Sequence, residues 1–278
     1  MPELPEVEVL RRSLEPHLVG DRIERVEVTN PSLREPVDVP RLRRAARGRE
    51  VVALRRRSKY LLIDLEGGWT VVVHLGMSGR LTLAPAAAPS ELHEHVAFHL
   101  QSGRRLRFRD PRRFGVVFAA KTAELDADPH FVHLGPEPLE PGLSGKALGE
   151  VLARAAAGRR GPVKAFLMDA GVVVGVGNIY ASETLHRAGV HPGRSVARIS
   201  RQRWQRVAES AMAVLRQAIS QGGTTLNDFA DGEGRSGYFQ VSLTVYDREG
   251  EPCLACGRPV RRIVQAGRST FYCPGCQR

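Results

Sequence analysis

The chain opens with Met1-Pro2-Glu3-Leu4-Pro5-Glu6, and this stretch sets both its first structural element and its first candidate for chemistry. Proline is favoured in the first turn of a helix, and Pro5 stands where such a turn would begin. Downstream of it, apolar residues recur at helical spacing: Val7, Leu10, Leu14 and Leu18. The pattern predicts an amphipathic helix over residues 5–18.

The same stretch contains a candidate nucleophile. Removal of Met1 would leave Pro2 as a free secondary amine, and a free α-amino group has a pKa of about 7.7–8.0. The proline ring fixes φ, and Glu3 and Glu6 supply two carboxylates within reach of that amine. An amine beside proton-transfer groups is typical of Schiff-base chemistry on a sugar or carbonyl carbon. Taken alone, these residues fit a disordered terminus better than an active site, so the rest of the chain must decide.

Composition indicates a folded protein with an anionic partner. The 278 residues favour two domains, and 42% hydrophobic with 26% charged residues is ordinary globular composition. Lys and Arg number 41 against 30 Asp and Glu, which gives a net charge of +11 and a pI of about 10.2. Such an excess is typical of proteins that bind polyanions, nucleic acids above all, although solubility or a genome that favours arginine would also produce it.

The basic residues gather in two stretches. Residues 30–60 contain ten Lys or Arg and three acids, a net charge of +7. Residues 104–114 interleave arginines with Phe108 and Phe114. Each stretch alone could be a solvated strand face, but two of them in a basic chain favour contact with phosphates.

Several classes of protein are disfavoured. The first ten residues carry three glutamates and lack the basic and apolar regions of a signal peptide. Nothing approaches the apolar length of a membrane span, and all four cysteines follow Gly250, so none remains for a disulfide framework. We expect a cytoplasmic protein without a membrane partner.

Hydrophobic periodicity divides the rest of the chain. From residue 22 to 118, short β-branched runs separated by Gly and Pro predict about eight strands, arranged as a sandwich or flattened barrel. Helical patterns cover residues 146–157, 162–168, 178–187 and 200–221. We therefore predict an α+β protein: an N-terminal helix with an eight-stranded β-sandwich (1–130), a linker (131–145), a helical domain (146–250) and a short tail (251–278).

The tail contains a metal-binding pattern. Two C-x2-C knuckles are separated by sixteen residues: Cys253 with Cys256, and Cys273 with Cys276. Four thiolates in this spacing predict one structural Zn²⁺ with no open position for catalysis. The residues between the knuckles could form a two-stranded ribbon, with Arg268 near its turn and within reach of a phosphate, although a merely solvated arginine fits the spacing as well.

A series of motifs stands in order along nearly the whole chain: MPELPEVE (1–8), KYLL (59–62), HLGMSG (74–79), DPRRFG (110–115), HLGPEPL (133–139), GVGNIYASE (175–183), QGGTTL (221–226) and the four cysteines. Together these motifs resemble a family, bacterial formamidopyrimidine-DNA glycosylase (8-oxoguanine-DNA glycosylase/AP lyase). The chain lacks the Pro-Glu-Gly opening of the endonuclease VIII branch.

The resemblance implies a bifunctional mechanism on double-stranded DNA that contains oxidised purines. In the family, the N-terminal proline attacks C1′ of a damaged nucleotide, displaces the base, and forms an iminium ion from which both flanking phosphates are eliminated. By similarity, Pro2 is the nucleophile, Glu3 transfers protons at the sugar, and Glu6 helps to orient the reacting end. Lys59 matches the catalytic lysine of the family, and Lys164 matches a lysine linked to the processing of oxidised purines.

The resemblance also implies how the base leaves the duplex. A base within the stack must be extruded before it can react, and side chains commonly fill the gap that it leaves. Met77, Arg112 and Phe114 match the family's set of such side chains, with Arg112 bonding the orphaned cytosine. For Met77 and Phe114, packing in the core is the alternative reading.

The remaining implied DNA contacts lie mostly in the second half of the chain. The glycine-rich turn at 175–178 corresponds to the helix–two-turn–helix motif, with Asn178 on a phosphate. His95, Tyr238 and Arg268 are further implied DNA-binding positions, and residues 224–238 correspond to the base-recognition loop. The family implies that the enzyme acts as a monomer.

Two departures and two alternatives remain. Val9-Leu10 replaces a frequent Thr and small residue, and Ala165 replaces a frequent proline, but neither position carries a chemical role. A lesion-binding protein without catalysis would keep the DNA-contacting residues but lose Pro2, Glu3 or Lys59, and all three are present. An endonuclease VIII-like enzyme would keep the mechanism and prefer oxidised pyrimidines.

Overall fold

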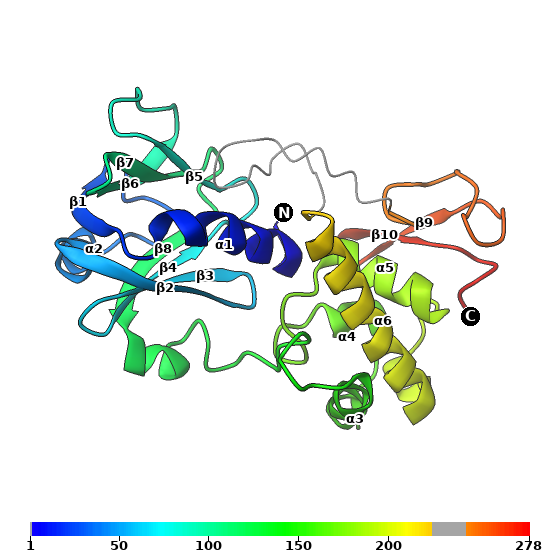
Figure 1. Ribbon diagram of the computed structural model, residues 1–278. Helices are drawn as coiled ribbons and strands as arrows, with labels where there is room; N and C mark the ends of the chain where they lie inside the picture. The colour runs from blue at the N-terminus through cyan, green and yellow to red at the C-terminus, as the bar shows by residue number, and fades with distance from the viewer. Residues whose placement is uncertain (1, 224–242) are drawn as a thin grey trace. The chain divides into compact units, whose positions relative to one another are not determined.

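The computed structural model describes residues 2–223 and 243–278, and these residues divide into two compact units. One unit contains the chain as far as Val132, and the other contains His133–Gln221 together with the C-terminal segment that ends at Arg278 (Figure 1). Among the described residues, none of the helices combines the length and the hydropathy that a bilayer crossing requires.

The first unit begins with helix α1 (Leu4–Leu18), one residue earlier than the periodicity predicts. Glu3 is its N-cap, and proline in the first turn costs the helix nothing because that N–H would have no partner. The predicted apolar stripe is the buried face of the helix: Leu4, Val7, Leu10, Leu14 and Leu18 are each at most 1% exposed.

Eight antiparallel strands form a single sheet in the order β5-β7-β6-β1-β2-β3-β4-β8. The strands are β1 (Arg22–Val28), β2 (Arg49–Arg57), β3 (Tyr60–Leu65), β4 (Trp69–His74), β5 (Arg80–Pro85), β6 (Glu94–Leu100), β7 (Arg104–Arg109) and β8 (Val116–Lys121). Only Arg22↔Glu50 and Ile23↔Arg49 join β1 to β2, so the sheet folds there into two four-stranded halves. The expected eight-stranded sandwich is confirmed, as one sheet with a short connection between its layers.

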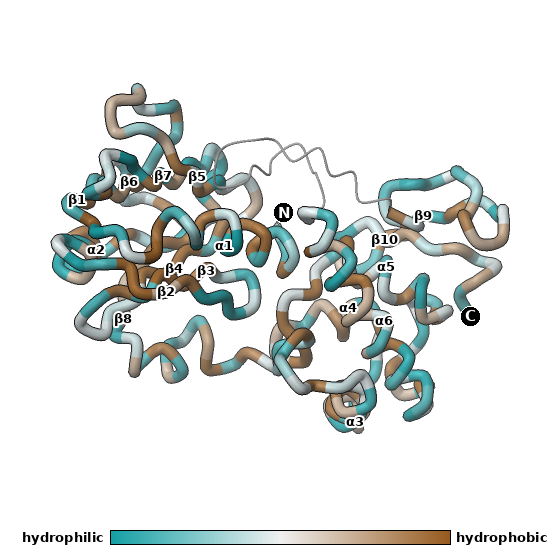
Figure 2. The backbone as a smooth tube through the Cα atoms, in the orientation of Figure 1, coloured by the Kyte–Doolittle hydropathy of each residue, from teal (hydrophilic) through white to brown (hydrophobic). Residues whose placement is uncertain are grey.

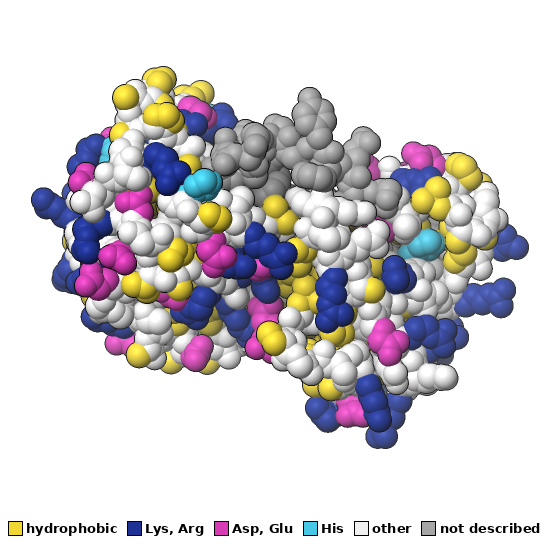
Figure 3. Space-filling model, viewed as in Figure 1, with side chains coloured by type: hydrophobic (Ala, Val, Ile, Leu, Met, Phe, Trp, Pro, Cys, Tyr) yellow, Lys and Arg dark blue, Asp and Glu magenta, His cyan; other side chains and the backbone are white. Residues whose placement is uncertain are grey.

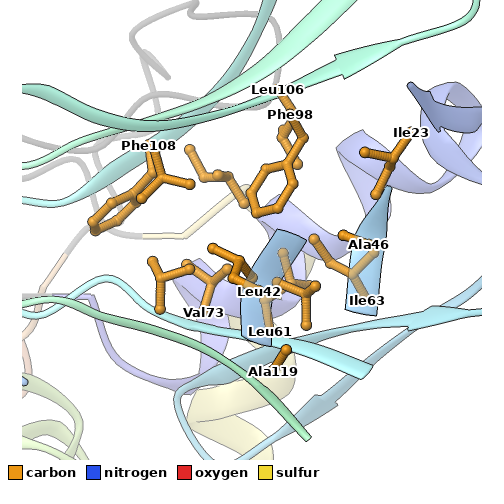
Figure 4. Close-up of a cluster of buried hydrophobic side chains, with 14 of the residues drawn as sticks. Ile23, Leu42, Ala46, Leu61, Ile63, Val73, Phe98, Leu106, Phe108 and Ala119 are labelled. Carbon is orange, nitrogen blue, oxygen red and sulfur yellow. The ribbon is translucent and has the colours of Figure 1, made fainter. Parts of the chain in front are cut away.

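The core of this unit lies between the two halves of the sheet. Phe98, Leu106 and Phe108 project from one half, and Leu61 and Val73 face them from the other (Figure 4). Strands β3 and β4 are buried at almost every position and appear mostly brown in Figure 2. This continuous burial explains why their sequences lack the alternation of a half-exposed strand.

One helix interrupts the predicted run of strands. Residues 39–46 form α2 (Val39–Ala46), whereas the texture of residues 22–118 had indicated strands only. Asp38 caps this helix by accepting a hydrogen bond from the Arg41 backbone N–H at 2.9 Å, and Pro40 occupies its first turn. Asp followed by proline before Leu42 and Ala45 is a helix-start signal that the basic residues around it obscured. A 3-10 turn, η1 (Thr122–Ala127), ends the unit's regular structure.

The second unit is helical, as expected. Its elements are α3 (Gly145–Ala156), α4 (Val163–Leu167), α5 (Asn178–Ala188), the 3-10 turn η2 (Val196–Arg198) and α6 (Arg201–Ser220). Helices α3 and α6 pack closely because Gly149 has no side chain: a Cβ there would lie 2.6 Å from Cα of Gln205. Ser144 and Ser200 cap α3 and α6 by accepting hydrogen bonds from backbone N–H groups.

The same unit ends in a two-stranded ribbon, β9 (Arg261–Gln265) and β10 (Arg268–Tyr272). Ala266 and Gly267 join the strands with φ of +48° and +72°, the positive pair that a type I′ hairpin turn requires. A small cluster forms the ribbon's base: Val245, Cys253, Val260, Phe271 and Cys273. So small a cluster indicates that the ribbon depends on a further stabilising element.

Candidate active site and metal centre

Pro2 directly precedes two carboxylates whose positions the first helix fixes. The Glu3 backbone N–H donates to Oε2 of Glu6 at 2.8 Å, and the Glu3 side chain accepts from the backbone N–H of Glu6. This reciprocal arrangement is a capping box, with glutamate in place of the usual Ser or Thr. Pro2 is buried, and Glu3 and Glu6 are only 1% and 2% exposed. Two rigidly held carboxylates therefore lie next to the candidate nucleophile in sequence.

Lys59 lies at the tip of the hairpin between β2 and β3. Ser58 and Lys59 are the whole connection, because Arg57 pairs directly with Tyr60. Ser58 has a φ of +57°, which the first position of a type II′ turn requires. A two-residue turn between paired strands leaves little backbone freedom, so the backbone of Lys59 is held in a fixed position.

An ion pair ties this hairpin to α1. Nε of Arg56 lies 3.3 Å from Oε2 of Glu8, and the Arg56 guanidinium also donates to the Ser58 carbonyl at 3.0 Å. Burial alone would raise the pKa of Glu8, but hydrogen bonds from Arg11 and Arg12 and the nearby charges of Arg11 and Arg56 lower it. Glu8 therefore stays ionised, and the element that begins beside Pro2 stays joined to the one that carries Lys59.

A neutral histidine lies close to Lys59. Burial lowers the pKa of His74 to about 4, and the positive charges of Lys59, Arg34 and His130 act in the same direction. Its Nδ1 accepts the Gly76 backbone N–H at 3.0 Å, so the proton of the neutral ring resides on Nε2. His74 is thus an uncharged donor at the entry to the loop that contains Met77.

The three side chains expected to enter the duplex are exposed on two loops. Met77 lies between β4 and β5, and Arg112 and Phe114 lie between β7 and β8. Met77 is 37% exposed and Phe114 is 43% exposed, while Cζ of Arg112 lies 4.8 Å from the centre of the Phe114 ring. Exposure of two large apolar side chains argues against the alternative of core packing.

His95 occupies a different environment. It is only 4% exposed, and its Nε2 lies 2.8 Å from the carbonyl oxygen of Asp110. Its ring therefore contacts the first residue of the loop between β7 and β8 and supports that loop.

Lys164 is a buried cation in the second unit. It is 2% exposed, and its Nζ donates to Oδ1 of Asn178 at 2.6 Å, to the Ser269 carbonyl at 3.0 Å and to Oγ1 of Thr270 at 2.8 Å. The Asn178 amide also donates to the Ser269 carbonyl at 3.1 Å. Lys164 therefore joins the first residue of α5 to strand β10 of the ribbon.

The surface of this unit is basic around these elements. Helix α6 carries one glutamate, Glu209, against four arginines: Arg201, Arg203, Arg206 and Arg216. Arg268 is exposed where β10 leaves the ribbon turn. Lys and Arg side chains are prominent on the face that Figure 3 shows. Such a surface suits a polyanion.

The four cysteines converge as a metal site. Their sulfur atoms all lie within 4.8 Å of one another, with Cys253–Cys276 at 3.9 Å and Cys256–Cys273 at 3.4 Å. Zn–S bonds of about 2.3 Å in a tetrahedron imply sulfur separations of about 3.8 Å, so the cluster has the right size for Zn²⁺. His186 adds a contact that the spacing did not predict, with Nε2 3.5 Å from the Cys253 sulfur.

A buried carboxylate that the sequence did not single out anchors the base of the ribbon. Glu183 on α5 is 6% exposed and accepts hydrogen bonds from the backbone N–H groups of Thr244, Val245 and Tyr246 at 2.9, 3.0 and 2.9 Å. The Thr244 hydroxyl is a fourth donor. The signal available beforehand was a glutamate among apolar residues of a helix.

Tyr238 and residues 224–242 lie outside the described part of the chain.

Comparison with known proteins matches the whole length. Three family models align in order: the formamidopyrimidine-DNA glycosylase N-terminal domain (residues 1–117), the H2TH domain of the same glycosylase (134–230), and a zinc finger found in FPG and IleRS (250–278). Formamidopyrimidine-DNA glycosylases of Xanthomonas campestris and Acidithiobacillus ferrooxidans are 48% and 49% identical, each over 100% of both chains.

Solved structures agree with this match. The MutM (Fpg) protein of Thermus thermophilus superposes with a TM-score of 0.87 at 39% identity, over 99% of this chain and 98% of that one. Lactococcus lactis Fpg, in complex with DNA containing an abasic site, gives a TM-score of 0.88 at 31% identity over 99% of each chain.

Proposed function

Because this chain belongs to the formamidopyrimidine-DNA glycosylase family and is therefore a base-excision repair glycosylase and AP lyase acting on DNA, we propose that Pro2 is its nucleophile. The observation that carries the proposal is the placement of Pro2 directly before the buried pair Glu3 and Glu6. A secondary amine that adds to C1′ can form only a charged iminium, which withdraws electrons strongly.

The reaction begins when the Pro2 nitrogen bonds to C1′ as the bond from C1′ to the damaged base breaks, and the N–H proton of the amine is transferred to the departing base. Glu3 then transfers a proton to the ring oxygen O4′, which opens the sugar and gives the iminium. Loss of a proton from C2′ expels the 3′ phosphate, and a second elimination expels the 5′ phosphate. Glu6 accepts a hydrogen bond from the Glu3 backbone N–H and thereby orients the N-terminal residues that carry the nucleophile.

We place Lys59 near the reacting nucleotide and its phosphate, where a fixed positive charge stabilises the anion that leaves. Asn178 and Arg268 bind the phosphate backbone, and Tyr238 is a further position for DNA binding. His95 contributes to DNA binding through the loop that it supports, because its ring is buried against the Asp110 carbonyl. Lys164 acts on the oxidised purine only indirectly, because its ammonium is buried against Asn178 and β10.

The three exposed side chains on the loops of the first unit replace the extruded nucleotide. Met77 fills space, Phe114 stacks on a neighbouring base, and Arg112 bonds the base left without a partner. We propose oxidised purines, 8-oxoguanine and formamidopyrimidines, as the damaged bases. A Lactococcus lactis Fpg structure with DNA containing Fapy-dG supports this class.

We propose Zn²⁺ as the metal at Cys253, Cys256, Cys273 and Cys276. Four thiolates and Zn²⁺ carry a net charge of −2, whereas the arginines of residues 251–278 exceed the single acid by four, so the metallated ribbon remains positive. Its role is structural because four protein ligands leave no open position. With thiolates held by metal and DNA as substrate, we place the protein in the bacterial cytosol.

Borohydride trapping tests the proposal. Purified protein whose N-terminus is Pro2 is incubated with a duplex carrying one 8-oxoguanine opposite cytosine, reduced, digested and analysed by mass spectrometry. We expect an adduct on Pro2, no adduct on Pro2 when Met1 is retained, and greatly reduced trapping for Pro2→Gly. Pro5→Ala is the matched control, because it changes a nearby proline and leaves the amine intact.

The same assay decides between the alternatives. Tight binding without strand cleavage or adduct would indicate a lesion-binding protein that lacks catalysis. Preferential cleavage of thymine glycol over 8-oxoguanine would indicate a specificity of the endonuclease VIII type.

A further inference from the structure

The loops that carry Met77, Arg112 and Phe114 meet at one buried carboxylate. Asp110 is 0% exposed and begins the loop between β7 and β8. Its Oδ1 accepts the Ser78 hydroxyl at 2.6 Å, and its Oδ2 accepts the Gly115 backbone N–H at 2.7 Å. The Asp110 side chain therefore bonds the other loop with one oxygen and closes its own loop with the other.

Further hydrogen bonds extend this connection. Oγ of Ser78 accepts the backbone N–H of Arg112 at 3.2 Å, so Ser78 links Asp110 to the residue that we propose bonds the unpaired base. The Asp110 backbone N–H donates to the His93 carbonyl at 3.0 Å, and His95 contacts the Asp110 carbonyl. Every polar group of Asp110 thus has a partner.

The backbones of the two loops also touch. Gly76 has a φ of +63°, and a Cβ there would lie 2.4 Å from the carbonyl carbon of Phe114. A Cβ at Gly115 would lie 2.5 Å from the Phe108 ring and 2.9 Å from the His74 carbonyl. Arg113, between Arg112 and Phe114 in the sequence, has a φ of +56°. Close contact and unusual backbone angles persist only where surrounding structure holds them.

We propose that Asp110 is a positioning residue for base extrusion, which holds the two loops as one unit so that Met77, Arg112 and Phe114 are in place before DNA arrives. The inference rests on the proposed function, since it assigns these three side chains to the gap in the duplex. Fixing loops in their bound conformation removes the ordering cost of binding, and a carboxylate with two charge-assisted hydrogen bonds does this more firmly than neutral groups.

The inference separates two activities of the same protein. Excision of 8-oxoguanine requires that a stacked base be extruded, whereas cleavage at an abasic site starts from a nucleotide without a base. Weakening the clamp should therefore slow excision much more than abasic-site cleavage. A residue that merely stabilises the fold would lower both activities in proportion to the folded fraction.

Asp110→Asn is the central variant, because an amide presents N–H groups to one of the two donors. We expect single-turnover excision of 8-oxoguanine to fall about tenfold or more and abasic-site cleavage to change less than about twofold. A 2-aminopurine beside the lesion should show a smaller fluorescence rise on binding, since the stack opens less. Ser78→Ala removes the two hydrogen bonds of the Ser78 hydroxyl, to Asp110 and from the Arg112 N–H, but keeps the bond between Asp110 and Gly115, and should show the same split to a smaller extent.

Asp64→Asn is the matched control. Asp64 is 8% exposed and accepts hydrogen bonds from the Thr70 hydroxyl at 2.7 Å and from the Arg55 guanidinium. The loop that carries Met77 follows His74, which pairs with Tyr60 at the start of β3, whereas Asp64 lies near the other end of that strand. We expect it to leave the ratio of the two activities unchanged.

A ratio equal to that of the wild type in both Asp110→Asn and Ser78→Ala would overturn the inference. If Asp110→Asn does not fold, Ser78→Ala alone decides. Failure of the proposed function itself is seen separately, as a wild-type protein that does not excise 8-oxoguanine at all.

Discussion

Replacing Glu183 by glutamine should weaken the attachment of residues 244–246, at the base of the ribbon, to α5. The carboxylate accepts four hydrogen bonds, three from consecutive backbone N–H groups and one from the Thr244 hydroxyl. A glutamine oxygen can keep about two of them, and its NH2 group then faces the other two donors. Hydrogen bonds to a charged group contribute about 1.5–3 kcal/mol each, so Glu183→Gln should cost about 3–6 kcal/mol. That is a large part of the stability of an ordinary domain.

Urea denaturation followed by circular dichroism gives the free energy of unfolding, and a chromogenic chelator gives the rate of metal release. We expect a lower midpoint and faster release for Glu183→Gln, because Val245 and two of the cysteines share one small cluster. Glu150→Gln on the exposed side of α3 is the control and should change stability by less than about 0.5 kcal/mol. A loss below about 1 kcal/mol for Glu183→Gln would refute the reasoning.

Four further outcomes are expected. Verified removal of the metal should abolish DNA binding measured by fluorescence anisotropy, since structural zinc binding supplies folding free energy; unchanged affinity would contradict this. The pKa of His74 is about 4 in the folded protein and about 6.5 in the unfolded chain, so the stability that the neutral ring contributes is complete above pH 6.5 and falls by up to about 3 kcal/mol towards pH 4. Thermal melts of His74→Asn should lack this pH-dependent component. Gly76→Ala should destabilise the first unit by about 3 kcal/mol, as its Cβ would overlap the Phe114 backbone; a melting temperature equal to that of the wild type would exclude the overlap. DNA affinity should fall steeply with salt, and Arg268→Ala should reduce the slope of log K against log salt by about one, an equal slope being the contrary result.

The regular elements were largely predictable because local patterns decide them. Helix α1 follows from apolar residues at helical spacing after a proline, and β3 lies within the stretch of residues 22–118 that was predicted to form strands. Helix α2 was missed because its signal is short: an aspartate cap and a proline within a run of arginines. The sandwich was predicted, but the connection of its two layers into one sheet depends on two residue pairs between β1 and β2, and no local pattern specifies so short a pairing.

The candidate site could be proposed from the sequence where its residues are neighbours in the chain or form a spaced motif. Pro2, Glu3 and the four cysteines belong to this group, and the cysteine cluster has the expected size. Asp110 and Glu183 act through partners 32 and 61 residues away, so only the folded chain reveals what they bind. Lys164 shows the same limit, because its match to a family residue says nothing of its burial against Thr270.

The division of the chain into two units affects how the amount of active protein in a cell should be measured. The residues proposed for chemistry lie in the unit with the sandwich, whereas the metal ligands lie in the other, and Cys256 is exposed. A molecule made when the metal is scarce, or oxidised at that thiol, would have an intact reacting end but would lack the DNA contacts that depend on the folded ribbon. Antibody signal or total mass would include such molecules. Repair capacity in a cell should therefore follow the metallated fraction rather than the abundance of the polypeptide.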